Sequence, residues 1–187
     1  MSNTVTLQTY AQWSECLELL ATGNHDEACL MSMSQGSLAL VGGVVSLFSK
    51  RLAEEFNTRL SRCSDLLTRD LQRSSDESGV VRAILNARKS LAFLHRLAHV
   101  QSFPETLRTH LSDEVRKFAQ RAQTSLEDSA KTDRTGRLAV VLRNNNLSRY
   151  ESSVIESSIE RTTVTPATLS SNTTPLSGGI RRRNILS

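Results

Sequence analysis

The sequence has few aromatic residues, no long apolar run, and no Lys or Arg among its first 49 residues. Aromatics make up only 4% of the chain, so a core must be built mainly from Leu, Val and Ala, which suits packed helices better than a sheet. The longest apolar run, LALVGGVVSLF, spans 11 residues. A helix that spans a bilayer needs about 20. These absences predict an all-α protein that does not insert into a membrane.

Export signals and catalytic motifs are also missing. The three cysteines, Cys16, Cys29 and Cys63, follow no CxxC or CxxH spacing, which favours a reducing compartment. The first 20 residues contain no basic residue, so no secretory signal is predicted. No GxSxG, GxxxxGK[ST] or GxGxxG pattern occurs, and His95 and His99 lack the Glu and the third ligand of a zinc peptidase. We expect an intracellular protein that is not an enzyme, with no catalytic residue, metal or cofactor.

Charge is divided unevenly along the chain. The first 49 residues carry four acids, whereas residues 50–149 carry 19 Lys and Arg against 12 Asp and Glu. Most of the basic residues are Arg, whose planar guanidinium pairs with phosphate or carboxylate in a fork. The basic middle of the chain is therefore predicted to meet either a polyanion or an acidic protein surface.

Apolar spacing predicts a compact bundle of about six to seven helices. Tyr10, Trp13, Leu17 and Leu20 share one helix face, with Thr9 as N-cap and Gly23 as stop. Further helices are expected over 25–33, 38–73, 81–99, 105–126 and 137–143, and a last one through Ile159. Asn24 is the expected cap of the helix over 25–33, and a kink, break or close crossing is expected at Gly42 and Gly43. Ser102 with Glu105, and Ser148 with Glu151, have the spacing of capping boxes for the helices that follow them. Residues 137–143 could also form a strand, and we take the helix.

These helices make up one predicted domain over residues 1–161, with two helical halves meeting near 74–79 as the alternative. From Thr162 the composition shifts to Thr, Ser and Pro, which predicts a disordered tail over 162–187. The tail contains Arg181, Arg182 and Arg183, which could serve as a nuclear-targeting signal or an electrostatic tether.

Two helices carry stripes of positive charge. On the first, Arg59, Arg62, Arg69 and Arg73 share a face, and acids three or four residues earlier predict that much of this stripe is paired within its own helix: Glu55 with Arg59, Asp65 with Arg69 and Asp70 with Arg73. On the second, Arg82, Lys89 and Arg96 recur every seven residues, and no acid occurs between Glu77 and Glu105.

The acid-free helix is predicted to have two faces. Ile84, Leu91 and Ala98 are also seven residues apart and lie on another side, suited to packing. The cations could each contact a phosphate and release counterions, or they could meet an acidic partner such as the first 49 residues. The sequence leaves both alternatives open.

Further arginines surround the predicted turns TDRTG and RNNNLSRYE, where they could contact phosphates and 2′-hydroxyls by shape. Ordinary helix connectors have the same composition. Scarce aromatics argue against stacking on single-stranded bases, so if nucleic acid is bound, its backbone or duplex shape is the expected target. The predicted RNA-binding residues are Arg82, Arg88, Lys89, Arg96, Arg134, Arg137 and Arg143.

Several stretches resemble a known family: SLALVGGVV, the acid-free helix, LEDSAKTDRTGRLAVVLRNNNLSRYE and the polar tail. From Leu38 to Glu151 the chain looks like the small α-helical RNA-silencing suppressors of closteroviruses. The resemblance implies an oligomer with basic surfaces that binds duplex or small RNA in the host cytoplasm and blocks silencing by sequestration. The alternative is a helical protein-interaction or self-assembly module with no nucleic-acid role.

Overall fold

The computed structural model describes residues 7–23, 25–36 and 42–151 of the chain, and the secondary structure in these residues is helical, with no strand. The described elements are α1 (Tyr10–Thr22), α2 (Asp26–Gln35), α3 (Gly42–Arg73), α4 (Glu77–Ala98), α5 (Glu105–Thr132), α6 (Arg137–Asn144) and the short 3-10 helix η1 (Leu147–Arg149). The all-α prediction is confirmed. The predicted helix beyond residue 151 and the predicted tail over 162–187 lie outside the described residues.

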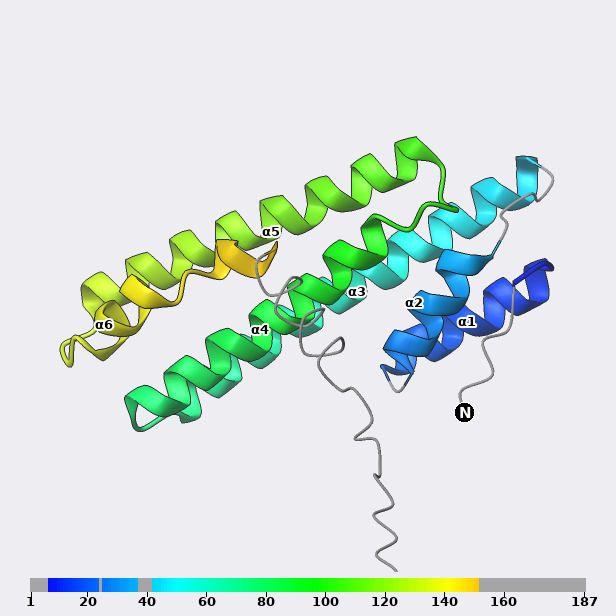
Figure 1. The fold of residues 1–187 in the computed structure, drawn as a ribbon. Coiled ribbons are helices and arrows are strands. Elements are labelled where there is room, and N and C mark those ends of the chain that lie inside the picture. Colours follow the sequence, from blue (N-terminus) through cyan, green and yellow to red (C-terminus); the bar gives the residue numbers. More distant parts are fainter. Residues whose placement is uncertain (1–6, 24, 37–41, 152–187) are drawn as a thin grey trace, which may run out of the picture.

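A long antiparallel pair of helices, α3 and α4, runs through the centre of the molecule (Figure 1). The 32 residues of α3 make it about 48 Å long at 1.5 Å per residue. α5 packs along α4, and α6 and η1 return against both α5 and α4. α1 and α2 lie at the end of the pair where α3 begins and α4 ends, so the opposite end of the pair extends beyond them (Figure 1).

The apolar core continues through all of these helices as one cluster. Its aromatic centre joins three distant segments: Trp13 of α1, Phe48 near the start of α3, and Phe103 between α4 and α5. The Trp13 and Phe48 rings meet edge to face with centroids 5.1 Å apart, and Phe103 lies 5.9 Å from Phe48. Such aromatic contacts add to the free energy gained by burying the rings.

Local signals for the ends of α1 are confirmed. The Thr9 hydroxyl accepts a hydrogen bond from the Gln12 N–H at 3.4 Å, and the Gln12 side chain accepts one from the Thr9 N–H at 3.1 Å. Gly23 ends the helix with φ +80°, a left-handed conformation that glycine adopts without a steric cost. The predicted start and stop of this helix therefore match the structure.

Two other predicted caps differ from the structure. α2 begins at Asp26, after His25, which makes no side-chain cap hydrogen bond; Asn24 lies outside the described residues. The capping box at Ser102 is wrong, because the cap position of α5 is Pro104 and the Ser102 hydroxyl instead donates to the Met33 carbonyl at 2.8 Å. Ser102 thus joins the α4–α5 connection to α2.

The close helix crossing expected at the glycines of α3 is also corrected. α3 is one continuous helix from Gly42 onward, and a Cβ placed on Gly43 would meet no atom within 4 Å, so the expected close helix crossing is wrong at Gly43. Residues 38–41 lie outside the described range. The close approach occurs at Gly36, where a Cβ would lie 2.7 Å from Cζ2 of Trp13.

Within the described part of the chain, none of the helices combines the length and the apolar character needed to cross a bilayer.

Candidate nucleic-acid interface

The two faces predicted for α4 are present. Ile84, Leu91 and Ala98 are fully buried, whereas Arg82 and Lys89 are exposed to solvent. Asp76 fixes the start of the helix by accepting a hydrogen bond from the Gly79 N–H at 2.9 Å. α4 therefore presents its cations on a surface held in place by core packing on the other side.

The acidic N-terminal segment neutralises one of these cations. Arg96 forms a two-bonded ion pair with Glu27 in the first turn of α2, with Nη1 3.0 Å from Oε2 and Nη2 bonded to Oε1. The side chain of Arg96 is only 21% exposed. Of the three cations spaced by seven residues, Arg96 is engaged within the molecule.

A second arginine binds the same turn of α2. Arg59 of α3 pairs with Asp26 through both carboxylate oxygens, at 2.8 and 2.6 Å, and also donates to the Leu20 carbonyl near the end of α1. Its guanidinium carbon lies 5.3 Å from the centroid of the Phe93 ring, and that of Arg96 lies 5.9 Å from it. The two cations thus flank one aromatic ring and hold the acidic turn of α2 over α3 and α4.

The ion-pair partners expected for the α3 arginines are wrong. Arg59 pairs with Asp26 of α2 rather than with Glu55. Arg62 donates to the Ala21 carbonyl at 2.7 Å, so it satisfies an unpaired carbonyl at the end of α1. Among the residues that the structure describes, the ion pair of Arg69 is with its neighbour Asp70, at 3.9 Å. The first half of this stripe therefore anchors α1 and α2.

The remaining cations of the two stripes are not engaged by α1 or α2. Arg73, Arg82 and Lys89 are exposed, and none of them has a side-chain hydrogen bond or ion pair with another described residue. We call these three residues the distal cationic face. Two exposed leucines lie on the same helices, Leu66 with 46% and Leu85 with 39% of its surface accessible. Sequence reasoning missed these leucines, because neither belongs to the spaced apolar residues predicted to face the core.

The arginines predicted at turns are engaged to different degrees. Arg137 donates to the Ser75 carbonyl, which brings the start of α6 against the α3–α4 turn. Arg134, one turn earlier, is exposed and has no described partner. Arg88 donates to the Arg149 carbonyl at 3.0 Å and so binds η1. The structure therefore brings Arg134 and Arg137 to the end of the molecule that carries the α3–α4 turn.

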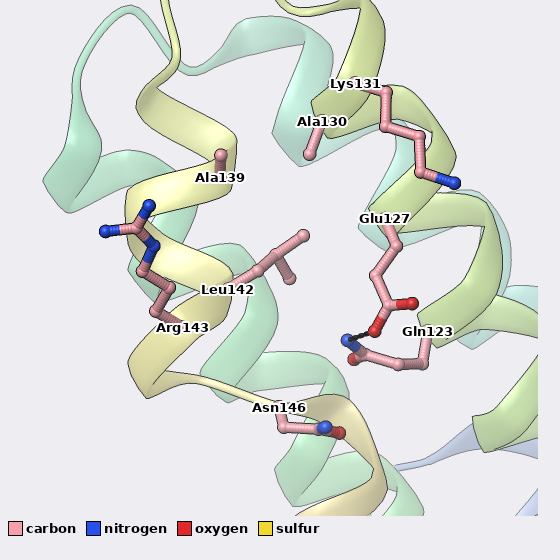
Figure 2. Close-up of a pocket in the computed structure, with 8 residues that line it drawn as sticks. All are labelled: Gln123, Glu127, Ala130, Lys131, Ala139, Leu142, Arg143 and Asn146. Atoms are coloured by element: carbon pink, nitrogen blue, oxygen red, sulfur yellow. Dashed lines mark hydrogen bonds between the residues drawn. The ribbon is translucent and has the colours of Figure 1, made fainter.

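Arg143 lies at a cavity of about 390 Å³ between α5 and α6 (Figure 2). The cavity wall is mainly apolar, formed by Ala130, Ala139 and Leu142. Figure 2 shows the Arg143 guanidinium directed away from Glu127, whose carboxylate accepts a hydrogen bond from Gln123 at 2.7 Å. The polar groups around the cavity therefore do not converge on one point, as a catalytic site would require.

Gln123 has a structural role that the sequence did not indicate. It is the one buried polar residue in the part of the chain that the structure describes, and its side-chain oxygen accepts a hydrogen bond from the Leu147 N–H at 2.9 Å. Asn146 supplies the local cap of η1 by accepting from the Ser148 N–H at 2.7 Å. The helix predicted after Ser148 extends through Ile159, mostly outside the described residues. The bond to Gln123 holds η1 against α5.

His95 and His99 stack with ring centroids 4.3 Å apart. The Nδ1 of His99 lies 2.8 Å from the His95 carbonyl, and the His95 ring lies 5.5 Å from the Tyr150 ring. The pKa of His95 is lowered by burial and by the charge of His99, while Glu151 raises it. Among the described residues, no three His, Cys, Asp or Glu side chains are grouped to hold a metal ion.

Comparison of the chain with protein-family models, with curated proteins and with solved structures returns no match. The resemblance to closterovirus suppressors therefore stays a prediction.

Proposed function

We propose that this protein binds the backbone of duplex RNA through the distal cationic face and has no catalytic activity. The observation that supports the proposal is the contrast between two groups of cations on the α3–α4 pair. Arg59 and Arg96 are engaged by acids of α2, whereas Arg73, Arg82 and Lys89 have no described partner. Unpaired, solvated cations on a rigid helix pair are available for phosphate.

The spacing of these cations suits a backbone rather than single bases. Arg82 and Lys89 are seven residues apart and so about 10 Å apart along α4. Arg134 and Arg137 extend the positive surface at the end of the molecule that carries the α3–α4 turn, and Arg137 is held there by its bond to Ser75. Contacts of this type position a duplex without reading its sequence.

If the protein binds short duplexes in this way, it would sequester them and suppress RNA silencing in a host cytoplasm, as the family resemblance implies. Arg181, Arg182 and Arg183, the predicted nuclear-targeting residues, lie outside the described residues.

The test compares RNA binding by two triple variants in gel-shift titrations at two salt concentrations. Replacing Arg73, Arg82 and Lys89 by Ala should weaken binding and lower the slope of log K against log salt by about 1 for each phosphate that the variant can no longer bind. The matched control replaces Arg116, Lys117 and Arg121 on α5 by Ala. Arg116 and Lys117 are already paired with Asp113 and Glu114.

The control variant removes the same charge, so equal loss of binding in the two variants would indicate a diffuse charge effect and contradict the proposed site. No binding of the wild-type protein to duplex RNA at low salt would reject RNA binding itself. Circular dichroism should show the same helix content in both variants, because all six side chains are exposed.

A second candidate function, self-assembly, is favoured by the two exposed leucines. Leu66 and Leu85 place apolar surface beside cations, a composition that also suits a protein partner. Replacing both by Ser should shift an oligomer to monomer in analytical ultracentrifugation. An unchanged sedimentation coefficient would exclude this surface from self-assembly.

A further inference from the structure

The outer face of α4 combines cations with an exposed apolar side chain. Arg82, Leu85 and Lys89 lie within about 60° of one another on a helical wheel of 100° per residue. Leu85 is 39% exposed, and neither cation has a side-chain partner among the described residues. This face therefore lacks both an apolar cover and counter-charges within the described structure.

The described chain ends directly beside this helix. The Arg149 carbonyl accepts a hydrogen bond from Arg88 of α4, and the Tyr150 ring packs edge to face on His95 of the same helix. Glu151 is close enough to His95 to raise its pKa. Whatever follows Glu151 therefore begins next to the C-terminal half of α4.

The sequence that follows Glu151 is complementary to the outer face of α4. Residues 152–160, SSVIESSIE, contain two acids, three β-branched apolar residues and no cation. Ile155 and Ile159 are four apart, and Glu156 and Glu160 directly follow them, so a helix there would carry an apolar stripe beside an acidic one. Glu156 and Glu160 are about 6 Å apart along such a helix, and the length of the Lys89 and Arg82 side chains spans the difference from the roughly 10 Å between their positions on α4.

We propose that residues 152–160 of this chain dock on the outer face of α4. Glu156 and Glu160 then face Lys89 and Arg82, and Ile155 and Ile159 cover Leu85. The molecule already uses this chemistry once, since the acidic first turn of α2 binds Arg59 and Arg96 around the Phe93 ring. The proposal applies the same pairing of an acidic helix with a basic, partly apolar surface to the other half of α4.

Docking would occupy two of the three residues of the distal cationic face. The segment and a duplex would then compete for Arg82 and Lys89, and weakening the segment would strengthen RNA binding. This consequence rests on the proposed function. Docking itself does not, and it can be measured in the absence of RNA.

The experiment measures how fast an amine-acetylating reagent modifies Lys89 in the full chain, with Lys117 of α5 as internal reference, by mass spectrometry of peptides. Replacing Glu156 and Glu160 by Gln should speed the modification of Lys89 about two- to fivefold, the effect of losing two exposed ion pairs. The matched control, Ser157→Lys with Ser158→Lys, changes the net charge by the same amount and should leave the rate nearly unchanged.

Equal rates at Lys89 in the wild type and the Gln variant would overturn the proposal. A second measurement tests the apolar contact: Leu85→Cys with Ile159→Cys should form a disulfide within one chain upon mild oxidation by oxidised glutathione. In that step the two thiols lose two protons and two electrons, and the glutathione disulfide is reduced to two thiols. A disulfide formed only between chains would mean that the segment docks on a second copy, which contradicts docking within one molecule.

Failure of this proposal and failure of RNA binding give different results. If the segment does not dock, Lys89 reacts equally fast in all variants while RNA binding can persist. If RNA does not bind, the gel shift is absent while Lys89 can still be shielded.

Discussion

Arg59 and Asp26 join α3 to α2 through two parallel N–H···O bonds of 2.8 and 2.6 Å, the geometry in which arginine and carboxylate pair most strongly. The Arg59 side chain is only 13% exposed and also donates to the Leu20 carbonyl. Because one guanidinium serves the end of α1, the start of α2 and the Phe93 ring, it orients the N-terminal pair of helices on the rest of the bundle.

Arg59→Ala should lower the free energy of unfolding by about 2–3 kcal/mol, because it leaves Asp26 and the Leu20 carbonyl without their charged donor. Urea denaturation followed by circular dichroism would measure the change. Arg69→Ala, ten residues later on the same helix, removes an exposed side chain and should change stability by less than about 0.5 kcal/mol. Equal losses of stability in the two variants would contradict an anchoring role for Arg59.

Gly36→Ala should destabilise the protein by about 1–3 kcal/mol, since the added methyl group would lie 2.7 Å from the buried Trp13 ring. Gly43→Ala introduces the same methyl group into open space at the start of α3. It should raise stability by up to about 1 kcal/mol through helix propensity. Thermal unfolding of the two variants should therefore shift in opposite directions, and a parallel shift would show that the packing at Gly36 is wrong.

The elements that sequence reasoning predicted well depend on residues close together in the chain. Thr9 with Gln12 and the glycine at 23 fix α1 through bonds spanning three or four residues, and α5 follows from the spacing of Leu107, Leu111 and Val115. The missed features join distant residues. Ser102 bonds to Met33 rather than capping α5, and Arg59 prefers Asp26 to the nearer Glu55. No periodicity encodes such partners.

The same distinction applies to the candidate interface. The two faces of α4 could be predicted from seven-residue spacing, but the division of its cations could not. Arg96 meets Glu27 across 69 positions of sequence, while Arg82 and Lys89 are exposed and have no partner among the described residues. The sequence indicated that an acidic segment could dock, and only the fold shows which cations it reaches.

Stability should fall as the pH drops below about 6.5, in part because of His95. Its pKa in the folded protein is lowered, first by burial and then by the charge of His99, against the raising effect of Glu151. The unfolded chain, whose His pKa is near 6.5, then binds a proton more readily than the folded one, so protonation favours unfolding from that pH down to the folded pKa.

The check is urea unfolding at pH 7.5 and 5.5. His95→Gln should show a smaller loss of stability between the two pH values than the wild type. His110→Gln, on the exposed side of α5, is the control and should keep the wild-type loss. If His95→Gln lost as much stability between the two pH values as the wild type does, other groups would cause the pH dependence.

Gln123→Leu should release η1 from α5. The leucine keeps the apolar volume but removes the acceptor of the Leu147 N–H, which would leave a buried donor unpaired at a cost of about 1–3 kcal/mol. Hydrogen exchange should quicken at Leu147 and its neighbours while α3 stays protected. Gln120→Leu, one turn earlier and exposed, is the matched substitution that should leave this exchange unchanged.

The Cys63 thiol should resist alkylation in the native protein. Burial raises its pKa to about 11, so little thiolate is present at pH 8, and only 4% of the residue is accessible. A Leu66→Cys variant places a thiol one turn along on the exposed side of α3. Mass spectrometry should show modification at position 66 within minutes and at Cys63 only in denaturant; rapid native labelling of Cys63 would show that α3 and α4 separate readily.

The ion pair between Glu27 and Arg96 sets an order of events during synthesis of the chain. Its partners are 69 residues apart, and at about 5–20 residues per second the ribosome needs roughly 3–14 s to produce the second after the first. Until then the acidic turn of α2 has no Arg96 to bind, and Trp13 has no Phe103 to cover it. The nascent N-terminal pair therefore exposes an aromatic, acidic surface for several seconds, and that surface is available to a chaperone during this time.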